Sequence, residues 1–237
     1  MSEWINPAVD RALHADLYAR SGQVRVYDVL TSDRASAVGA ELGQLDPWVL
    51  TCANRDGMAE ISLAQMETWS DQQRADLQAT LNASARQGVG FAYLGHRLDA
   101  AWRARTAPSA LSMFHDALNG PQIGDLIAEI TGRRDFNGSS IQATRFGPNH
   151  YLTRHRDNPE SERRRLAVVW GFTPEWHPDW GGLLQFFTDG GTPTLSFAPG
   201  FNTLDIFDIQ MVHSVTYVTP FAGAVRQAIS GWMVETT

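Results

Sequence analysis

Two stretches of different texture follow one another along the chain, and the first is dominated by helical signals. Ser70-Asp71-Gln72-Gln73 resembles a capping box, in which the serine and glutamine side chains satisfy backbone N–H groups at a helix start. Pro121 and Gly132 stand where a first helical turn and a helix end favour them. Alternating apolar and β-branched residues predict two strands in the same stretch. The predicted helices span 31–45, 70–87, 109–118 and 121–131, and the predicted strands span 23–30 and 88–93.

After Gly132 the apolar residues form short runs separated by turn-forming residues. The separators include Asp-Asn-Pro, Trp-Gly-Gly, Asp-Gly-Gly and Ala-Pro-Gly, which favour turns because of their special backbone preferences. About eight short strands at close spacing are typical of a jelly roll or barrel. We predict a mainly β fold in a single domain over 1–237, with a helix-rich support region (1–135) and a β-rich core (136–237). The predicted strands of the core span 139–146, 150–155, 166–173, 182–188, 193–197, 203–209, 212–218 and 225–234.

Composition narrows the classes of partner. With 237 residues, 43% hydrophobic and 19% charged, the chain is an ordinary soluble globular protein, and its net charge of −7 argues against nucleic-acid binding. No apolar stretch reaches the roughly 18 residues needed to cross a bilayer, and the N-terminus lacks a secretory pattern. Cys52 is the one cysteine, so a disulfide framework and a thiolate zinc site are excluded. We therefore expect a cytoplasmic protein with neither a membrane nor a nucleic-acid partner.

All 19 basic residues are arginine, because the sequence contains no lysine. Schiff-base catalysis, pyridoxal phosphate attachment and the lysine of a phosphate-binding loop are thereby excluded. A cation that binds a carboxylate must be an arginine, whose planar fork suits bidentate pairing.

A candidate metal site is formed by His155-Arg156-Asp157 and the distant His213. Residues i and i+2 of an extended strand point to the same face, so His155 and Asp157 can reach one ion. Two histidines and one carboxylate are the facial triad of non-heme Fe(II) oxygenases, which leaves coordination positions open. A single histidine in a strand usually has a structural role. Here His213 lies in an apolar run, where an unpaired imidazole is costly, and Asn158-Pro159 predicts a turn at the mouth of the barrel.

Arg226 is the candidate cation beside this site. It lies on one face of a predicted strand together with Ala228, Ser230 and Trp232. Burying an arginine without a partner is expensive, and a bound dicarboxylate would provide the partner.

From Gln142 to its end, the chain resembles the prolyl-4-hydroxylase-like branch of the 2-oxoglutarate and Fe(II)-dependent dioxygenases. Within this branch, Arg164-Arg165-Leu166-Ala167 and Ala228-Ile229-Ser230-Gly231-Trp232 look most like the ribosomal-protein prolyl hydroxylases. The other matching motifs are Gln142-Ala143-Thr144-Arg145-Phe146, His155-Arg156-Asp157-Asn158-Pro159, Trp176, Trp180-Gly181-Gly182-Leu183-Leu184, Pro199-Gly200-Phe201-Asn202, His213-Ser214-Val215 and Arg226.

The resemblance implies a double-stranded β-helix, a cupin-like jelly roll with the N-terminal helices packed on it. It also implies that His155, Asp157 and His213 bind Fe(II) and that Arg226 binds the distal carboxylate of 2-oxoglutarate. The expected reaction uses O2, with ascorbate as reductant, and hydroxylates a prolyl residue of a protein or peptide with release of succinate and CO2. Asp157 favours hydroxylation over halogenation, because the carboxylate occupies the position that a halide would need.

The chain also departs from the family pattern around the cosubstrate. Gly171 stands where relatives often carry a tyrosine, and Phe146 replaces another tyrosine. We therefore expect Ser230, Gln142 and Trp232 to complete the cosubstrate site beside Arg226.

Two alternatives to a protein prolyl hydroxylase remain open. One is a hydroxylase of free proline or another small metabolite, and the other is a cupin-like metal-binding sensor without turnover. We expect Arg163-Arg164-Arg165 to form a solvated turn or strand start, and 46–69 to form a lid over the site. The other histidines are expected to be structural or exposed, and three tryptophans are expected to be packing residues. The histidines are His14, His96, His115, His150 and His177, and the tryptophans are Trp170, Trp176 and Trp180.

Overall fold

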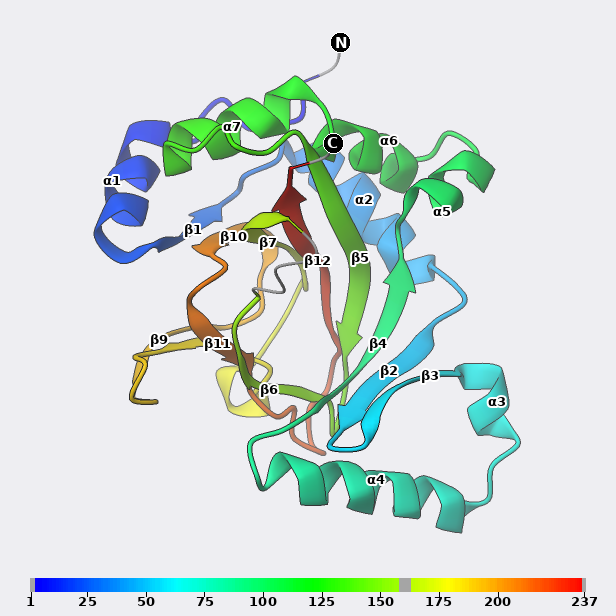
Figure 1. Cartoon of the computed structure of the whole chain (residues 1–237). Coiled ribbons are helices and arrows are strands. Elements are labelled where there is room, and N and C mark those ends of the chain that lie inside the picture. The colour runs from blue at the N-terminus through cyan, green and yellow to red at the C-terminus, as the bar shows by residue number, and fades with distance from the viewer. Residues whose placement is uncertain (1–2, 158–162, 236–237) are drawn as a thin grey trace.

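The protein is built around one curled antiparallel sheet, shown in Figure 1. The computed structural model describes residues 3–157 and 163–235. Within them, twelve strands form the sheet in the order β1-β10-β7-β12-β5-β4-β6-β11-β8-β9, with a β2–β3 hairpin added beside β4. This is the predicted double-stranded β-helix with helices packed on it. The strands after Gly132 are β5 (Gly138–Phe146), β6 (Tyr151–His155), β7 (Arg164–Phe172), β8 (Leu184–Phe187), β9 (Pro193–Phe197), β10 (Phe201–Asp208), β11 (Val212–Val215) and β12 (Arg226–Val234).

All eight strands predicted for this part of the chain are confirmed, with ends that shift by at most three residues. The apolar runs fold as strands because neighbouring elements bury them, in β10 on both faces of the sheet, where six consecutive residues are buried. A short 3-10 helix, Pro178–Trp180, separates β7 from β8.

The N-terminal part contributes both helices and strands. Its strands are β1 (Gln23–Tyr27), β2 (Val49–Asn54), β3 (Gly57–Ser62) and β4 (Phe91–Arg97). The sheet therefore crosses the division predicted at residue 135, because β4 pairs with both β5 and β6. The helices are α1 (Arg11–Ser21), α2 (Ser32–Gln44), α3 (Leu63–Glu67), α4 (Asp71–Ala85), α5 (Ala100–Arg105), α6 (Ala110–Leu118) and α7 (Pro121–Thr131).

The four predicted helices correspond to α2, α4, α6 and α7. The capping box at Ser70 and Gln73 is present, and Gly132 ends α7 in the left-handed conformation. Three helices were missed, among them α1, in which only Tyr18 is buried. A helix that buries one side chain has no apolar periodicity for sequence reasoning to detect.

The segment 46–69, predicted to be a lid, is not a loop, although Ala53, Asn54 and Met58 line the cavity described below and its role as a lid stays a prediction. This segment forms the β2–β3 hairpin and α3, and β2 is held in the sheet by pairing with β4. Trp48, Leu50 and Cys52 of the segment are buried. The sequence predicts these strands only weakly, because polar residues interrupt the alternation of apolar positions. Pairing with neighbouring strands decides the structure of the segment instead.

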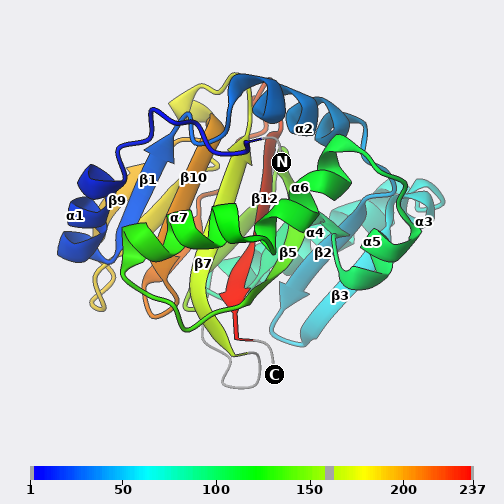
Figure 2. The same cartoon turned by 90° about the horizontal axis from the view of Figure 1, so that it is seen from above.

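Two groups of helices cover the sheet from different sides. In the view of Figure 2, α7, α6 and α2 lie across β10, β7, β12 and β5. Phe114 on α6 packs into the core between these helices and the sheet, and its ring meets that of Trp170 edge to face at 5.2 Å between centroids. Trp170 is fully buried, as expected for a packing residue. On the other side, α4 lies beneath β2 and β4 (Figure 1), and Tyr151 Oη donates a hydrogen bond to the Leu81 carbonyl at 3.0 Å.

None of the described helices combines the length and the apolar composition that a bilayer crossing requires.

Candidate metal centre

The three predicted metal ligands come together where β6 and β11 pair. His213 lies directly opposite His155 in the ladder, and the two imidazole centroids are 4.2 Å apart. Asp157 lies two residues beyond the end of β6, a correction to its predicted place on the strand. Its backbone N–H donates to the Ile209 carbonyl at 3.0 Å, which keeps it beside the ladder. The side-chain ligand atoms of all three residues lie within 4.8 Å of one another.

Both histidines present the same ring nitrogen to the carboxylate. His155 Nε2 lies 3.4 Å from Asp157 Oδ1, and His213 Nε2 lies 3.4 Å from Asp157 Oδ2. On the far side of each ring, Nδ1 is 3.0 Å from a backbone carbonyl, that of Thr153 or Met211. A carbonyl can only accept, so each Nδ1 carries the hydrogen and each Nε2 keeps its lone pair. Such carbonyl partners orient histidines that bind metals.

Burial sets the charges of the triad. Desolvation lowers the pKa of His213 to about 4, so this imidazole is neutral at pH 7. Desolvation alone raises the pKa of Asp157, but the neighbouring imidazoles of His155 and His213 outweigh it, and the net shift is downward. At neutral pH the donor set therefore includes an ionised carboxylate that lies between two imidazole nitrogens. No other cluster of three potential metal ligands occurs in residues 3–157 and 163–235.

The triad forms one wall of a cavity of about 610 Å³, and Arg226 lines the same cavity. Arg226 is the first residue of β12 and is 7% exposed. Its Nη1 has no hydrogen-bond partner among the described residues. Burial lowers the pKa of Arg226 to about 10, which still leaves a cation at neutral pH. A buried polar group without a partner needs an explanation, and a bound anion would provide one.

The other residues predicted for the cosubstrate, Gln142, Ser230 and Trp232, line this cavity as well. Ser230 is paired with Gln142 across the β12–β5 ladder, and Trp232 helps to lower the pKa of Asp157. All seven predicted site residues therefore lie around one cavity.

Tyr93 is a cavity residue that sequence reasoning missed. Its ring stacks on Phe146 at 5.2 Å, and its hydroxyl accepts a hydrogen bond from Gln142 Nε2 at 3.1 Å. Burial raises the pKa of Tyr93, so the phenol is neutral. The alternation of the β4 sequence was a usable signal for its orientation, but nothing local shows that β4 lies between β5 and β6.

Arg164 corrects the expectation of a solvated arginine run. It begins β7 as predicted, but its guanidinium carbon lies 3.3 Å from the Trp232 ring centroid. Its Nη1 is 3.8 Å from Asp157 Oδ1, and its side chain is 12% exposed. Arg164 therefore forms part of the cavity wall next to the triad.

Gly171 leaves no room for the tyrosine that relatives carry. A Cβ atom at this position would overlap the hydroxyl of Thr203 and lie 2.6 Å from the Gly200 carbonyl oxygen. Neighbouring β10 thus fills the space.

The remaining histidines lie apart from the triad, as expected. His150 Nδ1 accepts the Gly147 N–H at 3.1 Å, a local turn contact. His14 and His96 each place Nδ1 on a backbone carbonyl, and His115 and His177 lie beside neighbouring aspartates. The predicted turn at Asn158-Pro159 lies outside the described residues.

Comparison with known proteins confirms the resemblance inferred from the motifs. Residues 141–234, which include the triad and Arg226, match the model of the 2OG-Fe(II) oxygenase superfamily. The matched family consists of oxidoreductases that use Fe(II), 2-oxoglutarate and O2. No curated protein sequence matches this chain significantly.

Solved structures with this fold include prolyl hydroxylases. A prolyl-4-hydroxylase from Pseudomonas putida superposes with a TM-score of 0.61 at 18% identity, covering 95% of this chain and 99% of that one. A prolyl hydroxylase from Trichoplax adhaerens, in complex with a hypoxia inducible factor oxygen degradation domain peptide fragment, gives 0.61 at 16% identity, with 95% and 90% coverage. A non-heme alpha ketoglutarate dependent epimerase of nogalamycin biosynthesis gives 0.57 at 14% identity, with 98% and 85% coverage. At these identities the likeness establishes the fold, which hosts more than one reaction.

Proposed function

We propose that this protein is an Fe(II)- and 2-oxoglutarate-dependent dioxygenase that hydroxylates a prolyl residue of a protein or peptide. One observation carries the proposal: the triad of His155, Asp157 and His213 shares a cavity with a buried arginine whose Nη1 has no partner in the described chain. A metal site alone does not account for a desolvated cation in the same cavity. A dicarboxylate that binds both the metal and the arginine accounts for both.

The residues fit both groups. His155, Asp157 and His213 would hold Fe(II), since two imidazoles and one carboxylate leave coordination positions open. Arg226 would hold the distal carboxylate of 2-oxoglutarate, with Ser230, Gln142 and Trp232 nearby. When bound, the iron and cosubstrate supply the oxidation: one oxygen atom of O2 enters a substrate C–H bond, the other enters succinate, and CO2 is released.

The surrounding side chains and carbonyls position these groups and exclude water. The carbonyls of Thr153 and Met211 hold the two Nε2 atoms toward the carboxylate. The ring of Phe207 lies 4.7 Å from that of His213, on an apolar side of the cavity. The burial of Arg226 strengthens its pairing with an anion because the local dielectric is low.

The choice of a prolyl substrate rests on the motifs and on the prolyl hydroxylases among structures of the same fold. The second candidate is a hydroxylase of free proline or another small metabolite. The cavity volume of about 610 Å³ supports this second candidate, because binding sites for small molecules have this size. Use of ascorbate and a cytoplasmic setting are further expectations of the proposal.

Cosubstrate binding can be tested before any substrate is known. Anaerobic addition of 2-oxoglutarate to the Fe(II)-loaded protein should give a metal-to-ligand absorption band that saturates. Succinate release with O2 and ascorbate should then rise when a proline-containing peptide is added. If free proline stimulates and the peptides do not, the small-metabolite function replaces the peptide function. Metal binding without the absorption band or succinate would favour a cupin-like sensor.

A further inference from the structure

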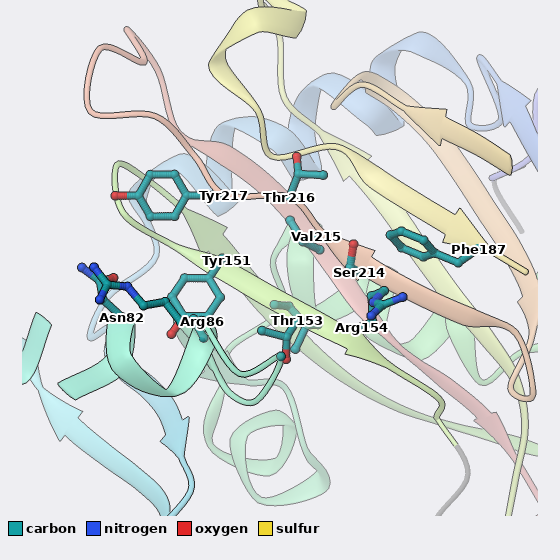
Figure 3. Close-up of a pocket in the computed structure, with 13 residues that line it drawn as sticks. Asn82, Arg86, Tyr151, Thr153, Arg154, Phe187, Ser214, Val215, Thr216 and Tyr217 are labelled. Atoms are coloured by element: carbon teal, nitrogen blue, oxygen red, sulfur yellow. The ribbon is translucent and has the colours of Figure 1, made fainter. Parts of the chain in front are cut away.

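A second hollow adjoins the cavity on the outside of β6. Its volume is about 600 Å³, and its floor is made by the neighbouring strands β6 and β11, with the C-terminal end of α4 along one side (Figure 3). Tyr151 ties this floor to α4 through its hydrogen bond to the Leu81 carbonyl. We call this hollow the outer groove. It is lined by Asn82, Ala85, Arg86, Gly88, Tyr151, Leu152, Thr153, Arg154, Phe187, Ser214, Val215, Thr216 and Tyr217.

The outer groove is basic in a protein that is acidic overall. Its lining includes Arg86 and Arg154 and no aspartate or glutamate, whereas the whole chain has a net charge of −7. Both arginines are exposed, and neither forms an ion pair with a residue that the structure describes. The nearest acidic side chain on the loop after β8, Asp189, is paired with Arg156 at 2.6 Å. The groove therefore presents two guanidinium groups that have no ion-pair partner among the described residues.

Aromatic rings line the groove next to its two arginines. The rings of Tyr151 and Tyr217 lie 6.3 Å apart. Arg154 lies over the Phe187 ring at 5.5 Å, with its guanidinium beside Gly191. In Figure 3, Arg86 and Arg154 lie toward opposite ends of the row of labelled residues, with Tyr151 and Thr153 between them.

The groove is continuous with the candidate metal centre. Five residues line both hollows: Gly88, Leu152, Thr153, Arg154 and Val215. Arg154 directly precedes His155, which is the most exposed member of the triad, with 30% of its side chain accessible. A chain that lies in the groove can therefore pass into the cavity beside the metal ligands.

We propose that the outer groove binds an extended acidic segment of the polypeptide substrate, next to the residue that enters the cavity. The inference rests on the proposed function and adds the charge of the substrate to it. Carboxylates of the segment pair with Arg86 and Arg154, while its apolar groups lie against Tyr151, Tyr217 and Phe187. The rest of the acidic surface repels the same segment, so attraction is confined to this groove.

Peptide binding to the metal-free protein tests the groove separately from turnover. The probe is a fluorescein-labelled peptide with one proline flanked by aspartate and glutamate, and its counterpart carries lysines at the acidic positions. Fluorescence anisotropy compares the parent, the double variant Arg86→Glu/Arg154→Glu, and the matched control Arg105→Glu. Arg105 is an exposed arginine at the end of α5, has no ion pair with a described residue and does not line either hollow.

We expect the double variant to bind the acidic peptide about tenfold more weakly, or about 1.4 kcal/mol, because two exposed attractions become repulsions. It should gain affinity for the lysine peptide, and Arg105→Glu should behave like the parent. Added salt should weaken the parent complex.

The proposal is overturned if the acidic peptide does not bind, binds parent and double variant equally, or is displaced by a single-stranded oligonucleotide that binds more tightly through the same arginines. Loss of the 2-oxoglutarate absorption band would instead contradict the proposed function, whatever the peptides do.

Discussion

Two buried arginines in this protein have opposite surroundings. Arg25 on β1 is paired through both ends of its fork with Asp205, at 2.6 and 2.7 Å, and its Nη1 donates to the Ala198 carbonyl at 2.6 Å. Arg226 on β12 is more deeply buried, yet its Nη1 has no partner in the described chain. The protein thus satisfies one guanidinium internally and leaves the other open to the cavity.

The charge of Arg25 also affects the pKa of Arg226. Burial is the main cause of the lowered pKa of Arg226, while Asp205 opposes the shift and Arg25 adds to it. Asp205 is already committed to Arg25, so it does not neutralise Arg226 by direct pairing. The difference places Arg25 in the scaffold and supports the proposal that Arg226 binds a ligand, because a lasting buried cation needs a counter-charge.

The largest expected effect tests whether Arg226 faces a metal at all. Asp157→Ala removes the anionic ligand, so iron binding and succinate release should be lost while the protein stays folded. Metal analysis, succinate assay and thermal unfolding measure the three properties. Asp189→Ala, which removes an exposed carboxylate of the loop after β8, is the control and should keep both iron and activity. Full iron occupancy in a His155→Ala/His213→Ala double variant would refute the assignment of the site.

The second-largest expected effect concerns Arg226. Arg226→Ala leaves the distal carboxylate of 2-oxoglutarate buried without a partner, at a cost of about 3–5 kcal/mol, or several hundred-fold or more in affinity. Titration of the metal-to-ligand absorption band should show this loss, with iron binding little changed. Arg226→Lys should recover part of the affinity, because an ammonium group cannot reproduce the fork. A parent-like titration of Arg226→Ala would mean that the carboxylate binds elsewhere.

The paired arginine should respond in the opposite way. Arg25→Met leaves Asp205 buried and uncompensated, so the free energy of unfolding should fall by about 3 kcal/mol. The double variant Arg25→Met/Asp205→Leu removes both charges and should regain most of this stability. Urea unfolding measures both. If Arg25→Met is as stable as the parent while Arg226→Ala unfolds readily, the roles assigned to the two arginines are reversed.

The smallest effect concerns Tyr93, whose hydroxyl is held by Gln142 in the same cavity. Tyr93→Phe removes one hydrogen-bonding group and keeps the ring stacked on Phe146. We expect 2-oxoglutarate to bind more weakly by about 0.5–1.5 kcal/mol, roughly two- to tenfold, with unfolding little affected. The same absorption titration applies. An unchanged constant would exclude the hydroxyl from the cosubstrate site.

Local patterns in the sequence determined much of this protein. The eight strands after Gly132 could be predicted because short apolar runs between turn residues have few other ways to bury themselves. The triad and Arg226 could be predicted because ligand chemistry depends on residue type, and the absence of lysine left arginine as the carboxylate partner. These inferences need only neighbouring residues or the identity of a side chain.

Tertiary structure alone decided which residues meet. Tyr93 reaches the cavity because β4 is inserted between β5 and β6, and Arg164 reaches Asp157 because β7 begins behind Trp232. Arg25 and Arg226 are both arginines in strands, and nothing local distinguishes them. Arg25 meets Asp205, 180 residues away, through the register of β1 on β10. Pairing between distant strands is a property of the whole sheet, so it alone makes one arginine structural and leaves the other open to a ligand.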